Sequence, residues 1–245
     1  MSFGERAALE GVLGQLRPRL SVEIGTYDGG SLGPIAARSG HVHTIDLDDL
    51  VPDRERFANV TFHVGDSREV LPGLLADLQE RGRPVDFAIV DGDHSAEGVA
   101  ADLTALLRSS AVAETVILMH DTMNPGVRAG IEQARVEDHE RVIYFEPDFV
   151  AGYEFRGGHF DGQVWGGLGL IVSGPERPSG YQASTRQTRY VEAFDGRAQT
   201  ARLAAEVEAL RGRLARELEA RRSLEASVSW RVTAPLRSAK RRLGR

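Results

Sequence analysis

The chain has 245 residues, of which 41% are hydrophobic and 27% charged, and these proportions suit a soluble protein with a sizeable core. It contains no cysteine, which excludes disulfides and thiolate chemistry. It also contains no apolar run of about 18 residues, the length that a membrane-spanning helix needs. The first residues lack the apolar stretch of a signal peptide, so we expect a cytoplasmic protein.

The net charge of −6 is unevenly distributed. Residues 228–245 contain six basic side chains and no acidic one, so the remainder of the chain carries −12. An acidic body argues against nucleic acid as a partner, because nucleic-acid binding needs a basic surface. The basic tail could attract anionic lipid headgroups, and we therefore predict peripheral contact with the inner membrane face, against the alternative of a solvated terminus.

Strand-like and helix-like segments alternate along the first two-thirds of the chain. Short apolar runs at 21–24, 42–45, 60–64, 87–90, 116–119, 142–145 and 168–172 predict strands, and 71–80 and 96–108 are compatible with helices. Near-continuous apolar strands are typical of a sheet covered on both faces. We therefore predict an α/β protein with a Rossmann-like, doubly wound, seven-stranded and mostly parallel sheet.

The composition changes after the last predicted strand. We predict a first domain over 1–180, a linker over 181–196 and a helical extension with a basic tail over 197–245. Leu203, Val207, Leu210 and Leu214 follow one another at steps of four and three residues, which is typical of an amphipathic helix. Two interpretations remain open for 197–226, a single helix packed on its own domain and a short coiled coil that forms a homodimer.

A turn with several glycines follows the first predicted strand, in the sequence Glu23-Ile24-Gly25-Thr26-Tyr27-Asp28-Gly29-Gly30-Ser31. Glycines at such a turn let the backbone approach a ligand closely. The spacing differs from the G-x-G-x-x-G of dinucleotide sites. The acid Glu23 suits the ammonium and sulfonium of S-adenosylmethionine better than a pyrophosphate, so we predict S-adenosylmethionine as the cofactor.

Two further acids follow the next two predicted strands. Asp46 comes about twenty residues after the turn, where an acid can accept both ribose hydroxyls. Asp66 follows Gly65 after the third strand and could meet the adenine amine, with a helix N-cap as its plainer role. The cofactor-binding residues that we predict are Glu23, Gly25, Thr26, Tyr27, Gly29, Ser31, Asp46, Asp66, Ser67 and Asp91.

These motifs resemble those of the class I S-adenosylmethionine-dependent methyltransferases, and the resemblance covers roughly residues 10–172. The segments Asp91-Gly92-Asp93-His94-Ser95 and His120-Asp121-Thr122 are most similar to the cephalosporin-hydroxylase-like and macrocin O-methyltransferase-like branches. That resemblance implies an O-methyltransferase that acts on a hydroxyl of a sugar, a glycan or a glycosylated natural product. A nicotinamide-dependent oxidoreductase and a non-catalytic scaffold in glycan assembly are the alternatives.

The fourth and fifth predicted strands both end in acidic and imidazole groups. Ligands of open α/β sheets bind beyond the carboxyl ends of the strands, so we expect Asp91, Asp93, His120 and Asp121 to face the transferable methyl group. Such a set could hold Mg²⁺ or Mn²⁺. The segment is also similar to catechol O-methyltransferase, and this resemblance implies that Asp91 and Asp121 bind the metal and that His94 is the general base.

One feature departs from that pattern, because His120 replaces one member of the usual acidic pair. We predict Asp91, His120 and Asp121 as the metal ligands, with Asp93 as a further candidate, and His94 and Asp91 as catalytic residues. Imidazole is a poorer ligand for Mg²⁺ than carboxylate, so Mn²⁺ or no metal at all are the alternatives. Between the sixth and seventh strands, 147–167 is predicted as a functional loop whose aromatic residues cover the acceptor, with extension of the core by these aromatics as the alternative.

Overall fold

The computed structural model of the chain describes residues 1–156, 161–174, 203 and 206–223. The chain divides into two compact units, Met1–Ala193 and Phe194–Arg245. The predicted linker 181–196 and the basic tail 228–245 lie outside the described residues, so the membrane contact of the tail stays a prediction. In the described part of the chain, no helix is long and apolar enough to cross a membrane.

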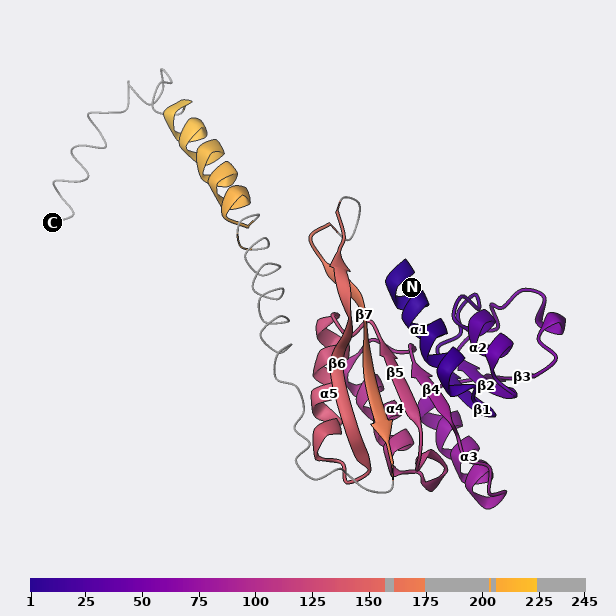
Figure 1. Cartoon of the computed structure of the whole chain (residues 1–245). Helices are drawn as coiled ribbons and strands as arrows, with labels where there is room; N and C mark the ends of the chain where they lie inside the picture. Colours follow the sequence, from indigo (N-terminus) through magenta and orange to yellow (C-terminus); the bar gives the residue numbers. More distant parts are fainter. Residues whose placement is uncertain (157–160, 175–202, 204–205, 224–245) are drawn as a thin grey trace, which may run out of the picture. The chain divides into compact units, whose positions relative to one another are not determined.

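The first unit is built on a seven-stranded sheet in the order β3-β2-β1-β4-β5-β7-β6 (Figure 1). The strands are β1 (Leu20–Ile24), β2 (His41–Asp46), β3 (Val60–Val64), β4 (Phe87–Val90), β5 (Val116–His120), β6 (Val142–Glu154) and β7 (Val164–Ser173). All neighbours pair in parallel except β7, which is antiparallel to both β5 and β6. The predicted Rossmann-like, mostly parallel sheet is confirmed.

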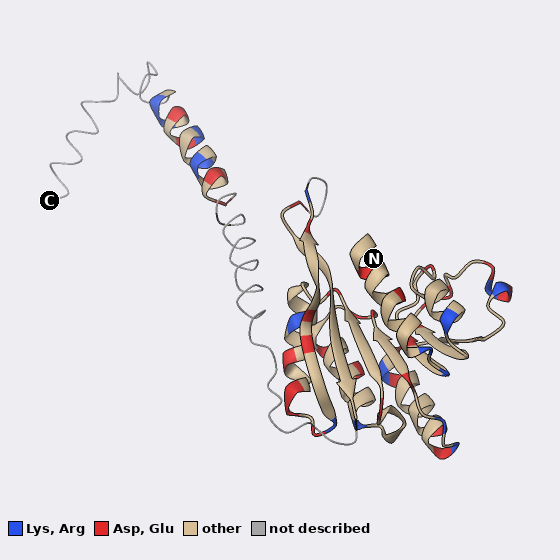
Figure 2. Ribbon diagram, in the orientation of Figure 1, with Lys and Arg blue, Asp and Glu red and all other residues tan. Residues whose placement is uncertain are grey.

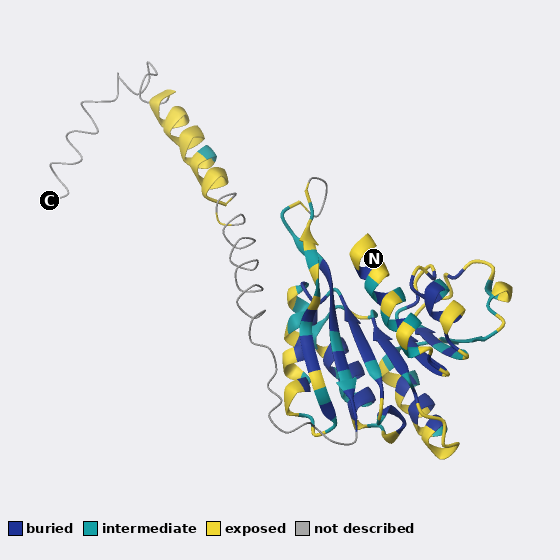
Figure 3. Ribbon diagram, viewed as in Figure 1, coloured by how far each residue is buried: buried dark blue, intermediate teal, exposed yellow. Residues whose placement is uncertain are grey.

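Helices cover both faces of this sheet, and β1 and β4 at its centre are fully buried, whereas the edge strands β3 and β6 are partly exposed (Figure 3). The helices are α1 (Phe3–Leu16), α2 (Leu32–Arg38), α3 (Ser67–Glu80), α4 (Ala96–Arg108) and α5 (Pro125–Gln133). One apolar cluster joins α1 and α2 to one face, and a larger one joins α3, α4 and α5 to the other. The strand order reverses between β1 and β4, where β2 and β5 lie on opposite sides, and this reversal places a ligand crevice at their carboxyl ends.

The segment predicted as a loop over 147–167 is largely a β-hairpin, so the loop prediction was wrong, whereas the role of its aromatic residues toward the acceptor stays a prediction. β6 continues to Glu154 and β7 begins at Val164, with Tyr153 paired to Trp165. Pro147 lies within a register shift between Glu146 and Val150. Because proline has no backbone N–H for the ladder, it belongs at such an irregularity, and the strand pairing resumes beyond it.

The second unit contains a helix over residues 206–223. Its described residues are exposed apart from Gly212, and Val207, Leu210, Leu214 and Leu218 are among the exposed apolar side chains. Figure 2 shows acidic and basic residues interspersed along this helix. The helical character predicted for this segment therefore holds over 206–223.

Candidate active site

The turn after β1 depends on a glycine at its first position. Gly25 has a φ of +89°, and a side-chain carbon there would lie 2.0 Å from the carbonyl oxygen of Asp91, so the turn after β1 and the end of β4 approach closely. Beneath the turn, the fully buried Glu23 accepts hydrogen bonds from the hydroxyls of Ser31 (2.7 Å) and Thr44 (2.6 Å). Burial raises the pKa of Glu23 to about 7. Glu23 thus stabilises the turn through its hydrogen bonds to Ser31 and Thr44, and its side chain does not line the adjacent pocket.

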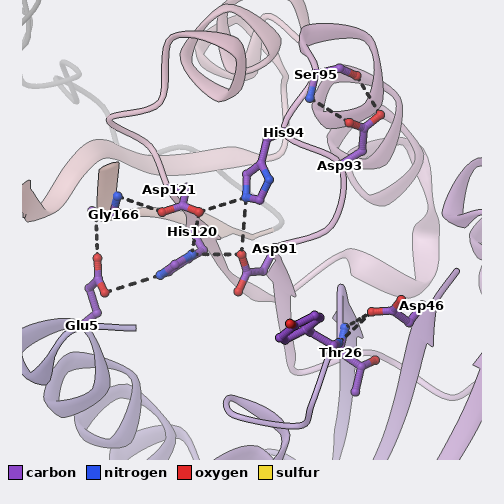
Figure 4. A network of polar contacts seen from close by, with 12 residues as sticks. Glu5, Thr26, Asp46, Asp91, Asp93, His94, Ser95, His120, Asp121 and Gly166 are labelled. Carbon is purple, nitrogen blue, oxygen red and sulfur yellow. Dashed lines mark hydrogen bonds and ion pairs between the residues drawn. The ribbon is translucent and has the colours of Figure 1, made fainter. Parts of the chain in front are cut away.

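Asp46 holds the same turn from the end of β2 (Figure 4). One of its carboxylate oxygens accepts hydrogen bonds from the backbone N–H groups of Thr26 and Tyr27, both at 2.7 Å. Tyr27 has a φ of +48°, in the left-handed region that non-glycine residues seldom adopt. The acid predicted to bind the ribose therefore also fixes the backbone of the glycine turn.

A pocket of about 610 Å³ lies over the carboxyl ends of β1, β2 and β4. Its walls contain all of the predicted cofactor-binding residues except Glu23 and Gly29, together with His94. These predicted residues are Gly25, Thr26, Tyr27, Ser31, Asp46, Asp66, Ser67 and Asp91. Asp66 is also the N-cap of α3 and pairs with Arg68, whose hydrogen bonds lower the pKa of Asp66 to about 2. The volume and concavity are those of a small-molecule site.

Four of the predicted reacting groups, Asp91, His94, His120 and Asp121, converge beside one end of this pocket (Figure 4). His94 Nε2 lies 2.9 Å from Asp121 Oδ2 and 3.9 Å from Asp91 Oδ1. Among the described residues, this buried nitrogen has no aligned hydrogen-bond partner. The side chains of Asp91, His94 and Asp121 place one candidate ligand atom each within 4.8 Å of the others. The group of side chains that could surround a cation is therefore Asp91, His94 and Asp121, whereas the sequence analysis predicted His120 in place of His94.

His120 is held between three carboxylates. Its Nδ1 lies 2.9 Å from Asp91 Oδ1 and 3.4 Å from Asp121 Oδ2, and its Nε2 lies 3.5 Å from Glu5 Oε2. Burial alone would disfavour a charged ring, but these carboxylates outweigh it and raise the pKa of His120 to about 12. At neutral pH His120 is therefore an imidazolium, which has no lone pair to offer a metal.

Glu5 is the member of this network that the sequence did not reveal. It comes from α1, is fully buried, and accepts a hydrogen bond of 2.6 Å from the backbone N–H of Gly167 and another from that of Ser2. Its spacing from Ser2 predicts only a helix capping box, which the structure also contains. Glu5 joins α1 to β7 and faces His120, and no local pattern indicates that second contact.

The backbone around Asp121 is arranged for this site. Asp121 has a φ of +53°, and its Oδ1 accepts a hydrogen bond of 2.8 Å from the N–H of Gly166 in the β6–β7 hairpin. Strained conformations of this kind cluster at functional sites. Trp165 of the same hairpin meets the ring of His94 edge-on, with 5.9 Å between the ring centroids. The hairpin therefore forms one wall beside the reacting groups.

Asp93 lies apart from this network. Its carboxylate accepts hydrogen bonds from the backbone N–H and the hydroxyl of Ser95, the N-cap of α4. These bonds lower its pKa. Asp93 thus shapes the start of α4 and the pocket wall, and it is outside the group of three that could surround a cation.

Comparisons with known proteins agree with this fold. Residues 22–122 match the model of a family described as a methyltransferase domain, whereas no curated protein sequence matches the chain. Among solved structures, the chain is similar to an O-methyltransferase from Bacillus cereus in complex with SAH, at 19% identity and a TM-score of 0.52, over 71% of this chain and 82% of that one. It is also similar to cofactor-bound Rv0187 from MTB, at 20% identity and a TM-score of 0.53, over 71% and 81%. Residues 22–122 are thus similar to a methyltransferase domain, and the chain shares the Rossmann-like fold of these solved structures.

Proposed function

We propose that this chain is an S-adenosylmethionine-dependent O-methyltransferase. The observation that carries the proposal is the continuity of one pocket from the glycine turn and Asp46 to His94 and Asp91. A cofactor held at the first end would present its reacting group to the second. When bound, S-adenosylmethionine supplies an electrophilic methyl group on a sulfonium, and the steps below belong to residues of this chain.

The cofactor end of the pocket fits such a ligand. Gly25 leaves no side chain between the turn and β4, and Asp46 offers a carboxylate at the distance along the chain where an acid meets a ribose. Asp66 and Ser67 line the region that follows β3, where the adenine would lie. The turn that would hold the cofactor is already ordered by two hydrogen bonds to Asp46, which limits the entropy lost on binding.

His94 is our proposed general base for the acceptor hydroxyl. Its Nε2 is directed at Asp121 and Asp91 and lacks an aligned hydrogen-bond partner among the described residues, so an acceptor O–H could donate to it. Asp121 raises the pKa of His94 by stabilising the imidazolium. This raised pKa makes His94 a stronger base, and proton transfer would place the positive charge beside two carboxylates.

Asp91, His94 and Asp121 would hold a divalent cation if one takes part. Two carboxylates and one imidazole suit Mn²⁺ better than Mg²⁺, because Mg²⁺ prefers oxygen ligands alone. Such an ion would lower the pKa of a bound hydroxyl. His120, as an imidazolium, would then orient Asp91 and Asp121 from behind.

The acceptor that we propose is a hydroxyl of a sugar, a glycan or a glycosylated natural product. Trp165 supports it, because this half-buried indole lies beside His94 and offers a flat apolar face bounded by polar groups. Tyr153, its partner in the hairpin, is 40% exposed and extends the same wall. Acceptors with a rigid ring would match this surface better than flexible chains.

Three measurements test the proposal. Calorimetry should detect micromolar binding of S-adenosylmethionine and none of NAD, and failure to bind the former would overturn the function. His94→Gln should lower kcat about 10²–10⁴-fold, the usual contribution of a general base, with cofactor affinity nearly unchanged. His139→Ala, at a histidine outside this network, is the matched control.

EDTA should inhibit a metal-assisted enzyme and Mn²⁺ should restore its activity, whereas full activity after EDTA would leave His94 to act without metal.

A further inference from the structure

Three histidines gather at the β2–β3 edge of the sheet, and none of them lines the cofactor pocket. His41 and His43 are alternate residues of β2 and so point to the same face, and His63 comes from the adjacent β3. The ring centroid of His43 lies 4.9 Å from that of His41 and 5.2 Å from that of His63. All three are only partly exposed.

The contact between His43 and His63 is a close approach of two ring nitrogens. His43 Nδ1 lies 3.0 Å from His63 Nε2, so a single proton lies between them if both rings are neutral. Burial lowers the pKa of His43 to about 4 and also lowers that of His63, which keeps both rings neutral at physiological pH. The other nitrogen of His43, Nε2, is buried and has no hydrogen-bond partner among the described residues. The fold therefore places two neutral imidazoles side by side and leaves His43 Nε2 without a hydrogen bond among the described residues.

We propose that His43 and His63 form a binding site for a divalent transition-metal ion, with Zn²⁺ as the simplest probe. Two nitrogens bound at about 2.0–2.1 Å to a tetrahedral Zn²⁺ lie about 3.3 Å apart, close to the 3.0 Å found here. The ion would take the place of the shared proton. Imidazole favours Zn²⁺, Ni²⁺ and Cu²⁺ over Mg²⁺, so this site would differ in metal preference from the carboxylates near His94.

His41 is a further imidazole beside this pair, with its ring centroid 4.9 Å from that of His43. Its Nε2 now contacts the Thr61 hydroxyl at 3.1 Å, and rotation of the ring away from Thr61 would free that nitrogen. Water would supply the remaining positions. Ions of this class would hold β2 to the edge strand β3, and β2 carries Asp46 at its end. The site would thus stabilise the strand pair that supports the cofactor turn.

Two charged groups act on this cluster in opposite directions. Arg83 lies within electrostatic range of His41 and His43 and disfavours added positive charge, whereas Asp77 of α3 favours it at His43. Arg83→Ala should therefore tighten Zn²⁺ binding and Asp77→Asn should weaken it. A metal held elsewhere on the protein would not respond to this pair of variants with opposite signs.

The deciding experiment is a Zn²⁺ titration of the full chain by calorimetry, with histidine ring nitrogens observed by NMR. We expect His63→Gln to lose one equivalent of Zn²⁺ or to bind it at least about tenfold more weakly, and His43→Ala to do the same. Glutamine at position 63 can still hydrogen-bond to His43, so the strand pair should remain folded. His139→Ala should bind as the unmodified chain does.

A second series separates this site from the one near His94. In an Asp121→Ala background, which disables the candidate active-site cluster, Zn²⁺ should still shift the ring signals of His43 and His63 and still raise the melting temperature. Equal stoichiometry and affinity in the unmodified chain and His63→Gln would overturn the proposal. Ring signals of His43 and His63 that do not move with Zn²⁺ would overturn it as well.

Discussion

Replacement of Glu5 by glutamine tests whether the buried contact between α1 and His120 stabilises the fold. Burial by itself raises the pKa of a carboxyl group, yet the contacts of Glu5 with His120 and with the N–H groups of Ser2 and Gly167 outweigh it and lower the pKa from 4.5 to about 2. A difference of about 2.5 pKa units corresponds to about 3 kcal/mol at roughly 1.4 kcal/mol per unit. Glu5→Gln should therefore lower the unfolding free energy by about 3 kcal/mol at pH 7.

The pH dependence gives this prediction its sign. A carboxyl group whose pKa is lowered by folding stabilises the native state above its unfolded pKa, and that stabilisation is lost as the pH falls toward the folded pKa. The difference between the unmodified chain and Glu5→Gln should therefore shrink from about 3 kcal/mol at pH 7 to about 2 kcal/mol at pH 3.5. Glutamine keeps the size of the side chain, so the difference reports mainly the charge.

Urea unfolding followed by circular dichroism at both pH values provides the measurement. Glu10→Gln is the matched control, because Glu10 lies on the same helix and forms half-exposed ion pairs with Arg6 and Arg38, which contribute at most about 1 kcal/mol. A loss below about 1 kcal/mol for Glu5→Gln at pH 7, or a loss independent of pH, would refute the electrostatic account of this contact.

Three other variants test separate parts of the molecule. Asp46→Ala should weaken binding of S-adenosylmethionine by roughly 1.5–3 kcal/mol in calorimetry, because it removes a charged acceptor from the turn and the pocket; unchanged affinity would dismiss the ribose assignment. Burial raises the pKa of Glu23 to about 7, so the free energy of unfolding should fall by roughly 3 kcal/mol as the pH rises from 4.5 to above 7. Glu23→Gln should remove this decline in urea unfolding measured across that pH range, and parallel pH profiles of the two proteins would contradict the assignment. If the helix over 206–223 pairs with a second copy, Leu210→Glu with Leu214→Glu should convert a dimer to a monomer in light scattering, whereas Arg213→Glu should not.

Most of the fold could be predicted because its signals are local. Each parallel strand is a short apolar run, and Gly25, Asp46 and Asp91 follow the ends of such runs, where topology brings them to one edge of the sheet. The extended hairpin of β6 and β7 was missed because Pro147 resembles a strand breaker. The register shift that accommodates it depends on pairing with β7, which the sequence around Pro147 does not encode.

The candidate site was predicted less completely, since its roles depend on distant partners. The resemblance implied His94 as the general base and His120 as a metal ligand, but neither segment by itself shows which carboxylates each ring contacts. Glu5 distinguishes them in the structure, because it faces only His120 and helps keep that ring charged. His94 faces Asp121 and Asp91, and no ion pair joins it to Glu5 among the described residues. A contact from α1, more than a hundred residues earlier in the chain, therefore adds to the contacts with Asp121 and Asp91 that keep His120 charged.

The charges at the reacting end bear on which cation belongs there. Glu5, Asp91 and Asp121 contribute three formal negative charges and the imidazolium of His120 contributes one positive charge, so the cluster carries −2 while His94 is neutral. Such an excess in a partly buried site is costly unless a cation balances it. The sulfonium of a bound cofactor would supply one positive charge before methyl transfer, and the proton that His94 takes from the acceptor would replace that charge as the sulfonium becomes a neutral thioether, so one negative charge stays unbalanced without metal. A divalent ion beside His94 would balance the cluster, but it would compete with that proton for the same nitrogen. Metal assistance and proton uptake by His94 are therefore alternatives at this site, and inhibition by EDTA, or its absence, distinguishes them.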